Sequence, residues 1–154
     1  MARRSASLLL LVAACSTHPA APPVVCDGRL DEPAWRGALR TGPFHDASGG
    51  LARPYSDARI VVTRTAIYVA LYAADADIRS DDHFTLHVGE TSYRFGPADA
   101  GPDVGVDRDG TLDDPRDVDE EWIVEARLPR PKGPTVVHIE RCDVACGAAS
   151  LTLP

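Results

Sequence analysis

The sequence predicts an all-β fold, an antiparallel β-sandwich, and three observations support this prediction. Apolar and polar residues alternate in several short segments from residue 57 onward, with the period of a half-buried strand. Val, Thr, Asp, Gly and Pro are plentiful whereas Met, Lys and Gln are scarce, which favours strands joined by turns. The 154 residues suffice for one domain with a sizeable core.

The expected elements follow in chain order. Residues 32–39 are the only segment expected to be helical, over one or two turns, with Asp31 as its N-cap and Pro33 at a favoured first position. Strands are then expected at 57–64 and 66–74, joined by a tight hairpin at Arg64-Thr65. The later strands are expected at 82–88, 91–95, 119–128, 135–141 and 150–153.

Two tyrosines of the second expected strand are open to two interpretations. Tyr68 and Tyr72 share a face with Ala70, opposite to the aliphatic side chains of that strand. They can form a shallow aromatic platform for a ligand. Alternatively, and this is the interpretation that we favour, the second sheet covers them as part of the core.

The N-terminus has the pattern of an export signal. Arg3 and Arg4 precede a short apolar stretch, and Val12-Ala13-Ala14-Cys15 has the form of a lipobox. The pattern resembles bacterial lipoprotein signal peptides, in which the cysteine is lipidated and becomes the new N-terminus. We therefore expect a signal peptide at 1–14, a lipidated Pro/Ala-rich tether at 15–23 and the β-sandwich domain at 24–154. Ser16 after the cysteine favours the outer membrane, so an extracytoplasmic, lipid-anchored protein of the cell envelope is expected.

Charge and cysteine content restrict the partners. The formal net charge is −7, and an acidic domain is poorly suited to nucleic acid. If Cys15 is lipidated, Cys26, Cys142 and Cys146 remain as disulfide candidates. Cys142 and Cys146 can close a short local loop, and Cys26 can pair with either of them. The sequence alone does not choose among these pairings.

Aspartates gather in two expected loops, around residues 75–82 and 103–119. In the second, Asp107, Asp109 and Asp113 surround Gly110, and alternating aspartates around a glycine can supply oxygen ligands to calcium. The twelfth-position glutamate of the helix-loop calcium motif is missing, so a solvated acidic turn explains the same pattern. No other cofactor is indicated.

Three stretches carry recognisable motifs: 27–35 (DGRLDEPAW), the strand pair 58–64 and 66–74 followed by Asp81-Asp82, and 121–129 (EWIVEARLP). Together they resemble the family 9 carbohydrate-binding modules, which are antiparallel β-sandwiches. The opening motif is the most specific, and Gly28 within it suits a turn. Trp35 lies within the short helical turn and is expected to plug one end of the sandwich, and Trp122 is expected to pack in the core because it lies on the apolar face of its strand.

The resemblance also implies a function, a non-catalytic surface module that binds a glycan or another cell-envelope component. Sugar-binding members hold a sugar between aromatic side chains, and both tryptophans here are assigned to the fold. Nucleophile motifs, phosphate loops and His-Glu-x-x-His are absent from the sequence, so no enzyme is expected. The alternative is a structural or protein-interaction lipoprotein that has lost the sugar site. The candidate ligand residues are Tyr55, Tyr68, Tyr72, Asp81, Asp82 and Arg94.

Overall fold

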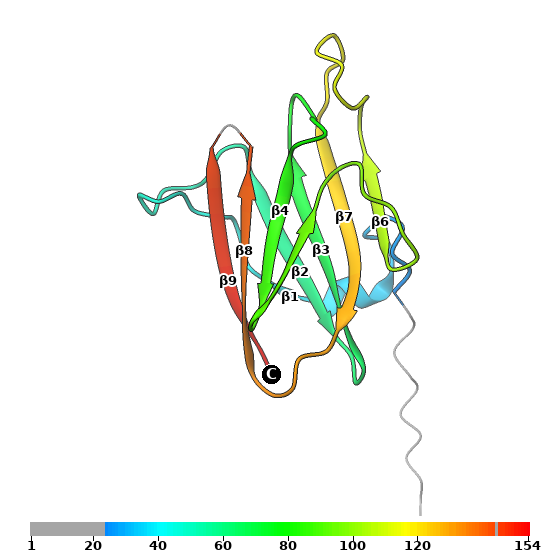
Figure 1. The fold of residues 1–154 in the computed structure, drawn as a ribbon, viewed down its shortest axis with the longest axis vertical. Coiled ribbons are helices and arrows are strands. Elements are labelled where there is room, and N and C mark those ends of the chain that lie inside the picture. The colour runs from blue at the N-terminus through cyan, green and yellow to red at the C-terminus, as the bar shows by residue number, and fades with distance from the viewer. Residues whose placement is uncertain (1–23, 144) are drawn as a thin grey trace, which may run out of the picture.

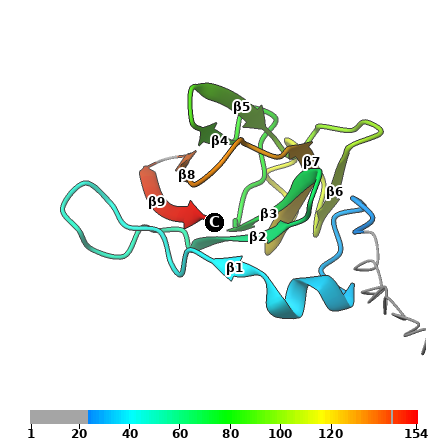
Figure 2. The ribbon, with the colours of Figure 1, turned by 90° about the horizontal axis from the view of Figure 1, so that it is seen from below.

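The computed structural model describes residues 24–143 and 145–154, which form two antiparallel sheets packed face to face (Figures 1 and 2). The five-stranded sheet has the order β1-β2-β3-β7-β6, and the four-stranded sheet has the order β5-β4-β8-β9. The expected all-β sandwich is therefore confirmed. The strands are β1 (Leu39–Arg40), β2 (Ser56–Val62), β3 (Ala66–Ala74), β4 (His83–Val88), β5 (Thr91–Phe95), β6 (Val104–Arg108), β7 (Glu121–Pro129), β8 (Thr135–Cys142) and β9 (Cys146–Leu153).

The core lies between the two sheets and is filled by the inward faces of their alternating strands. Trp122 of β7 is fully buried there, 5.1 Å from the ring of Phe84, as expected. Phe84 in turn meets Phe44 edge to face at 6.1 Å. Large aromatic groups in such a position dominate the burial energy of a small domain.

The outer face of the five-stranded sheet is partly covered by the N-terminal segment and the 3-10 helix η1 (Pro33–Gly37) (Figure 2). Trp35 of η1 is buried against Ala70 of β3. The expectation that Trp35 plugs an end of the sandwich is thus wrong, because the ring packs on the flat outer side of a sheet. The expected N-cap is also wrong: Glu32 precedes Pro33 as the cap, without a side-chain capping bond.

Most expected strands agree with the structure within a residue or two, and two strands were not expected. β1 has only two residues, and β6 pairs with β7 through Val104–Arg108, where the sequence suggests only an acidic loop. β9 begins at Cys146, earlier than expected, because Cys142 and Cys146 are joined by a disulfide that closes the β8–β9 turn.

Cys26 is a free thiol within the described chain. Within these same ranges, no helix is long and apolar enough to cross a membrane. The predicted lipidation site Cys15 and its tether lie outside the described residues.

Candidate functional site

On the outer face of the five-stranded sheet, near the end of β3, several side chains lie side by side. We call this group the tyrosine face. The strand register places Asp57 of β2 opposite Tyr72 of β3, and Tyr72 opposite Ile123 of β7. Side chains two residues apart on a strand share a face, so the neighbouring row adds Tyr55 and Glu121. The tyrosine face therefore consists of Tyr55, Asp57, Tyr72, Glu121 and Ile123.

The two rings of the tyrosine face touch. Tyr55 and Tyr72 lie with their ring centroids 6.0 Å apart at 64°, and Tyr55 is 42% exposed. The Tyr55 hydroxyl donates a 2.8 Å hydrogen bond to an Asp57 carboxylate oxygen, which raises the pKa of Tyr55. Burial and the neighbouring Glu121 carboxylate raise the pKa of Tyr72 to about 12. Both rings are therefore neutral and held in place at physiological pH.

An acidic hollow of about 230 Å³ adjoins the tyrosine face. Glu121 and Ile123 of β7 line it together with Asp107, Arg108 and Asp109 at the edge of the sheet, so three carboxylates face one guanidinium. Asp113 lies apart, in a loop where its carboxylate accepts the Ser80 amide at 3.0 Å. Two groups of three candidate metal ligands occur in the described residues, and neither contains Asp107, Asp109 or Asp113. The calcium site expected from these three aspartates remains a prediction.

Tyr68 belongs to a different environment. It faces outward from β3 like Tyr72, but it packs into the cluster of Trp35, Ala70 and Val61. The second sheet covers neither tyrosine, because the opposite face of β3 points into the core. The expectation that they are core residues is wrong. Since Trp35 covers Ala70 between them, the two rings do not form one platform either.

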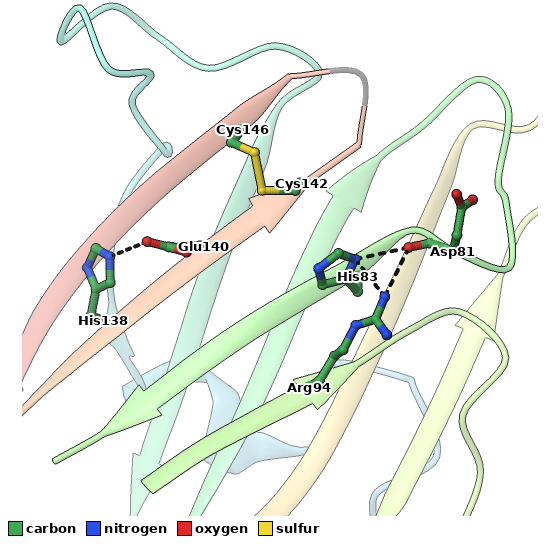
Figure 3. The surroundings of a disulfide bond; sticks show 7 residues. All are labelled: Asp81, His83, Arg94, His138, Glu140, Cys142 and Cys146. Atoms are coloured by element: carbon green, nitrogen blue, oxygen red, sulfur yellow. Dashed lines mark hydrogen bonds and ion pairs between the residues drawn. A yellow bond between two sulfur atoms is a disulfide. The ribbon is translucent and has the colours of Figure 1, made fainter. Parts of the chain in front are cut away.

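The predicted residues Asp81, Asp82 and Arg94 gather at the end of the sandwich where β3 ends and β4 begins. Figure 3 shows Asp81 and Arg94 around His83. Arg94 donates a 3.1 Å hydrogen bond to His83 and a 3.5 Å hydrogen bond to the Asp81 carbonyl. A polar cleft of about 490 Å³ opens here. Among the described residues that line this cleft, His83 has the one aromatic ring. The lining residues are Pro54, Asp75, Ala76, Asp77, Arg79, Asp81, Asp82, His83, Cys142 and Asp143.

The floor of this cleft is a buried ion pair. Arg141 of β8 binds Asp75 at 2.7 Å and lies 3.6 Å from Asp143. The Trp122 indole N–H also donates to Asp75, at 3.1 Å. Burial raises the pKa of the adjacent Asp82 to about 6, although the Arg79 amide donates to its carboxylate. The buried Arg141 guanidinium stabilises the negative charge of the three carboxylates around it, Asp75, Asp82 and Asp143. The alternation pattern of the sequence does not predict this buried ion pair.

Comparisons with known proteins support the fold only. Two solved structures of a family 9 carbohydrate-binding module from Caldicellulosiruptor kristjanssonii are similar to this chain. The complex with glucose has a TM-score of 0.59 at 14% identity and covers 85% of this chain and 82% of its own. The complex with cellotriose has a TM-score of 0.55 at 15% identity, covering 86% and 80%. No family model matches the sequence, and no curated protein matches it.

Sequence reasoning found part of this site and missed the rest. Tyr55 and Tyr72 were candidates, whereas Asp57, Glu121 and Ile123 were not. Alternation places Glu121 and Ile123 on the outward face of their strand, but the partner strand and its register were unknown. Pairing β3 with β7 is the step that brings Tyr72 beside Ile123.

Proposed function

We propose that the chain is a non-catalytic glycan-binding module and that the tyrosine face is its sugar-binding site. The observation that carries this proposal is the contact of the exposed Tyr55 ring with the half-buried Tyr72 ring, flanked by carboxylates on a flat sheet face. A sugar presents an apolar face that packs on aromatic rings and hydroxyl groups that need hydrogen-bond acceptors. The similarity to a module solved with glucose and with cellotriose is consistent with such a ligand.

The charge of the site selects among glycans. Four carboxylates, those of Asp57, Glu121, Asp107 and Asp109, surround the rings and the adjoining hollow. They outnumber the arginines there, which are Arg108 in the hollow and Arg59 and Arg40 near Tyr55. Carboxylates accept hydrogen bonds from sugar hydroxyls but repel uronic acids and sulfated sugars. The ligand is therefore a neutral saccharide, with glucose-containing oligosaccharides the first to test.

The alternative function is a structural or protein-interaction lipoprotein with the same fold. One observation favours it: both tryptophans are buried, Trp35 on the sheet and Trp122 in the core. A site built from two tyrosines offers less stacking area than one built from tryptophans. The titration below decides between the two functions.

Calorimetric titration of the full chain with glucose, cellotriose and an oligogalacturonate tests the proposal. We expect saturable binding of cellotriose and none of the anionic sugar. Tyr72→Ala should weaken cellotriose binding about tenfold, the equivalent of a lost stacking contact of about 1.4 kcal/mol. His87→Ala is the matched control, since this half-buried ring lies on the outer face of the other sheet. Absence of binding to any neutral sugar by the folded protein contradicts the proposal.

The cellular location is a second part of the proposal. We infer a lipid anchor on Cys15 from the lipobox and the preceding apolar stretch. The Cys142–Cys146 disulfide is consistent with an oxidising compartment. Cys15→Ala should move the protein from the membrane fraction to the soluble fraction, whereas Ser16→Ala should not. Retention of Cys15→Ala in the membrane fraction contradicts the anchor.

A further inference from the structure

A second group of three carboxylates lies on the lower half of the same outer sheet face, under the N-terminal segment. Asp27, Glu32 and Glu125 each offer an oxygen, and these oxygens all lie within 4.8 Å of one another. They come from three elements: the loop before η1, the residue that precedes η1, and the centre of β7. The fold therefore brings them together across nearly a hundred residues of sequence.

Close backbone packing holds this group together. Glu125 pairs across the sheet with Gly105 of β6, and the Cys26 carbonyl occupies the space that a side chain at Gly105 would fill. Gly28 has a φ of +87°, and a side chain there would collide with the backbone of Asp107. These two glycines let the N-terminal segment lie directly on the strands and cover Glu125, which is fully buried.

Each carboxylate is fixed through an oxygen by an N–H donor. Glu125 accepts the amides of Asp27 and Gly28 at 3.0 and 3.1 Å, both through Oε2. Glu32 accepts the Val25 amide at 2.9 Å and the Trp35 indole N–H at 3.1 Å. Asp27 accepts the Arg29 amide at 2.9 Å through Oδ1. The group is thus oriented before any ligand arrives.

The charge of the group is not balanced by the protein. Glu125 Oε1 is buried and has no hydrogen-bond partner. In residues 24–143 and 145–154, no ion pair involves Asp27, Glu32 or Glu125. Three carboxylates within 4.8 Å, with one of them fully buried, repel each other strongly unless a cation or a proton neutralises them.

We propose that Asp27, Glu32 and Glu125 bind a calcium ion, which fastens the N-terminal segment to the sheet. The donor set consists of carboxylate oxygens alone, which suits a hard cation and not zinc or copper. Glu125 Oε1 is the buried oxygen that such an ion would engage. Carboxylates bind a metal ion in their deprotonated form, so binding is tested at pH 8.

The test is thermal unfolding of the full chain at pH 8, first in EDTA and then in about 10 mM CaCl₂. This calcium concentration is chosen because calcium sites of extracellular modules have Kd values of about 10⁻⁴ to 10⁻³ M. We expect the Tm to rise by about 5 °C or more on adding calcium. Terbium offers a second readout, because Trp35 donates directly to Glu32 and can sensitise the luminescence of a nearby Tb³⁺ ion. Excess calcium should displace that emission.

Variants locate the site. Glu125→Gln and Asp27→Asn should both abolish the calcium-dependent rise in Tm, and Asp27 is exposed, so its variant should fold even if that of Glu125 does not. Glu90→Gln is the matched control, because Glu90 is an exposed carboxylate at the β4–β5 turn, and this variant should keep the full rise. A folded wild type that shows neither a rise in Tm nor terbium emission overturns the proposal. So does a rise that Glu90→Gln removes and Asp27→Asn retains.

Discussion

Two groups of three carboxylates in this molecule solve the same electrostatic problem in different ways. In the cleft group, Asp75, Asp82 and Asp143 lie within 4.8 Å of one another and surround Arg141. The N-terminal group of Asp27, Glu32 and Glu125 is equally tight and lacks an ion-pair partner among the described residues. Each group also has a tryptophan donor, Trp122 or Trp35. In the cleft group a buried cation pairs with Asp75 and Asp143, and only Asp82 has a raised pKa because of burial. The N-terminal group has no such cation and depends on an ion or a proton from solution.

Removal of Arg141 should produce the largest effect. Arg141→Met leaves the buried Asp75 and Asp82 without their cation, and breaking a buried pair from one side costs about 3–5 kcal/mol. Urea unfolding of this variant measures the loss. Arg94→Met, on the exposed side of the same end, should change stability by less than about 1 kcal/mol. Equal stability of Arg141→Met and wild type would mean that the cleft carboxylates need no cation.

The tryptophan donors should rank next. Trp122→Phe and Trp35→Phe keep most of the ring packing but remove one N–H donor, which costs about 1–3 kcal/mol when the acceptor is buried. Trp122→Phe should be the more damaging, because Asp75 is 5% exposed and Glu32 is only partly buried. Urea unfolding in EDTA gives the ranking. The reverse order would show that the Trp35–Glu32 hydrogen bond contributes more to stability than the Trp122–Asp75 hydrogen bond.

The pH dependence of stability should separate the two groups. Burial raises the pKa of Glu125 from 4.5 to about 7 and that of Asp82 from 3.8 to about 6. Each folded carboxyl holds its proton more tightly than the unfolded one. The unfolding free energy therefore falls as the pH rises through those windows, by at most about 1.4 kcal/mol per pH unit for one proton.

Between pH 6 and 7 this decline belongs mainly to Glu125. In EDTA, Glu125→Gln should be flat over that interval while Asp82→Asn keeps the slope. Calcium should also flatten the wild-type curve by replacing the proton. A slope that survives Glu125→Gln would assign the titration to another group. The measurement is a series of urea unfolding curves at half-unit steps of pH.

The contrast between the two groups also explains what the sequence could predict. Alternation sufficed for the strands from β2 to β5 and for the burial of Trp122, because period-two patterns reflect one buried face. It could not place Arg141 beside Asp75, since Asp75 follows β3 of one sheet and Arg141 lies 66 residues later in β8 of the other. Glu125 occupies an outward position that reads as solvent-exposed. Glu125 is buried because the N-terminal segment packs on it. Alternation within one strand cannot predict that another segment covers the strand's outer face.

The smallest effects should have opposite signs in the two groups. Asp143→Asn removes the outermost carboxylate of the cleft group, whose oxygen lies 3.6 Å from Arg141, and should destabilise the protein by about 0.5 kcal/mol. Asp27→Asn in EDTA removes one of three uncompensated charges and should be neutral or slightly stabilising, because the repulsion on Glu125 falls. Saturating calcium should reverse the second sign, since the lost charge is then a lost ligand. Urea unfolding of both variants in EDTA and in calcium completes this comparison. Destabilisation by Asp27→Asn in both conditions would mean that its hydrogen bond to the Arg29 amide, and not its charge, is what matters.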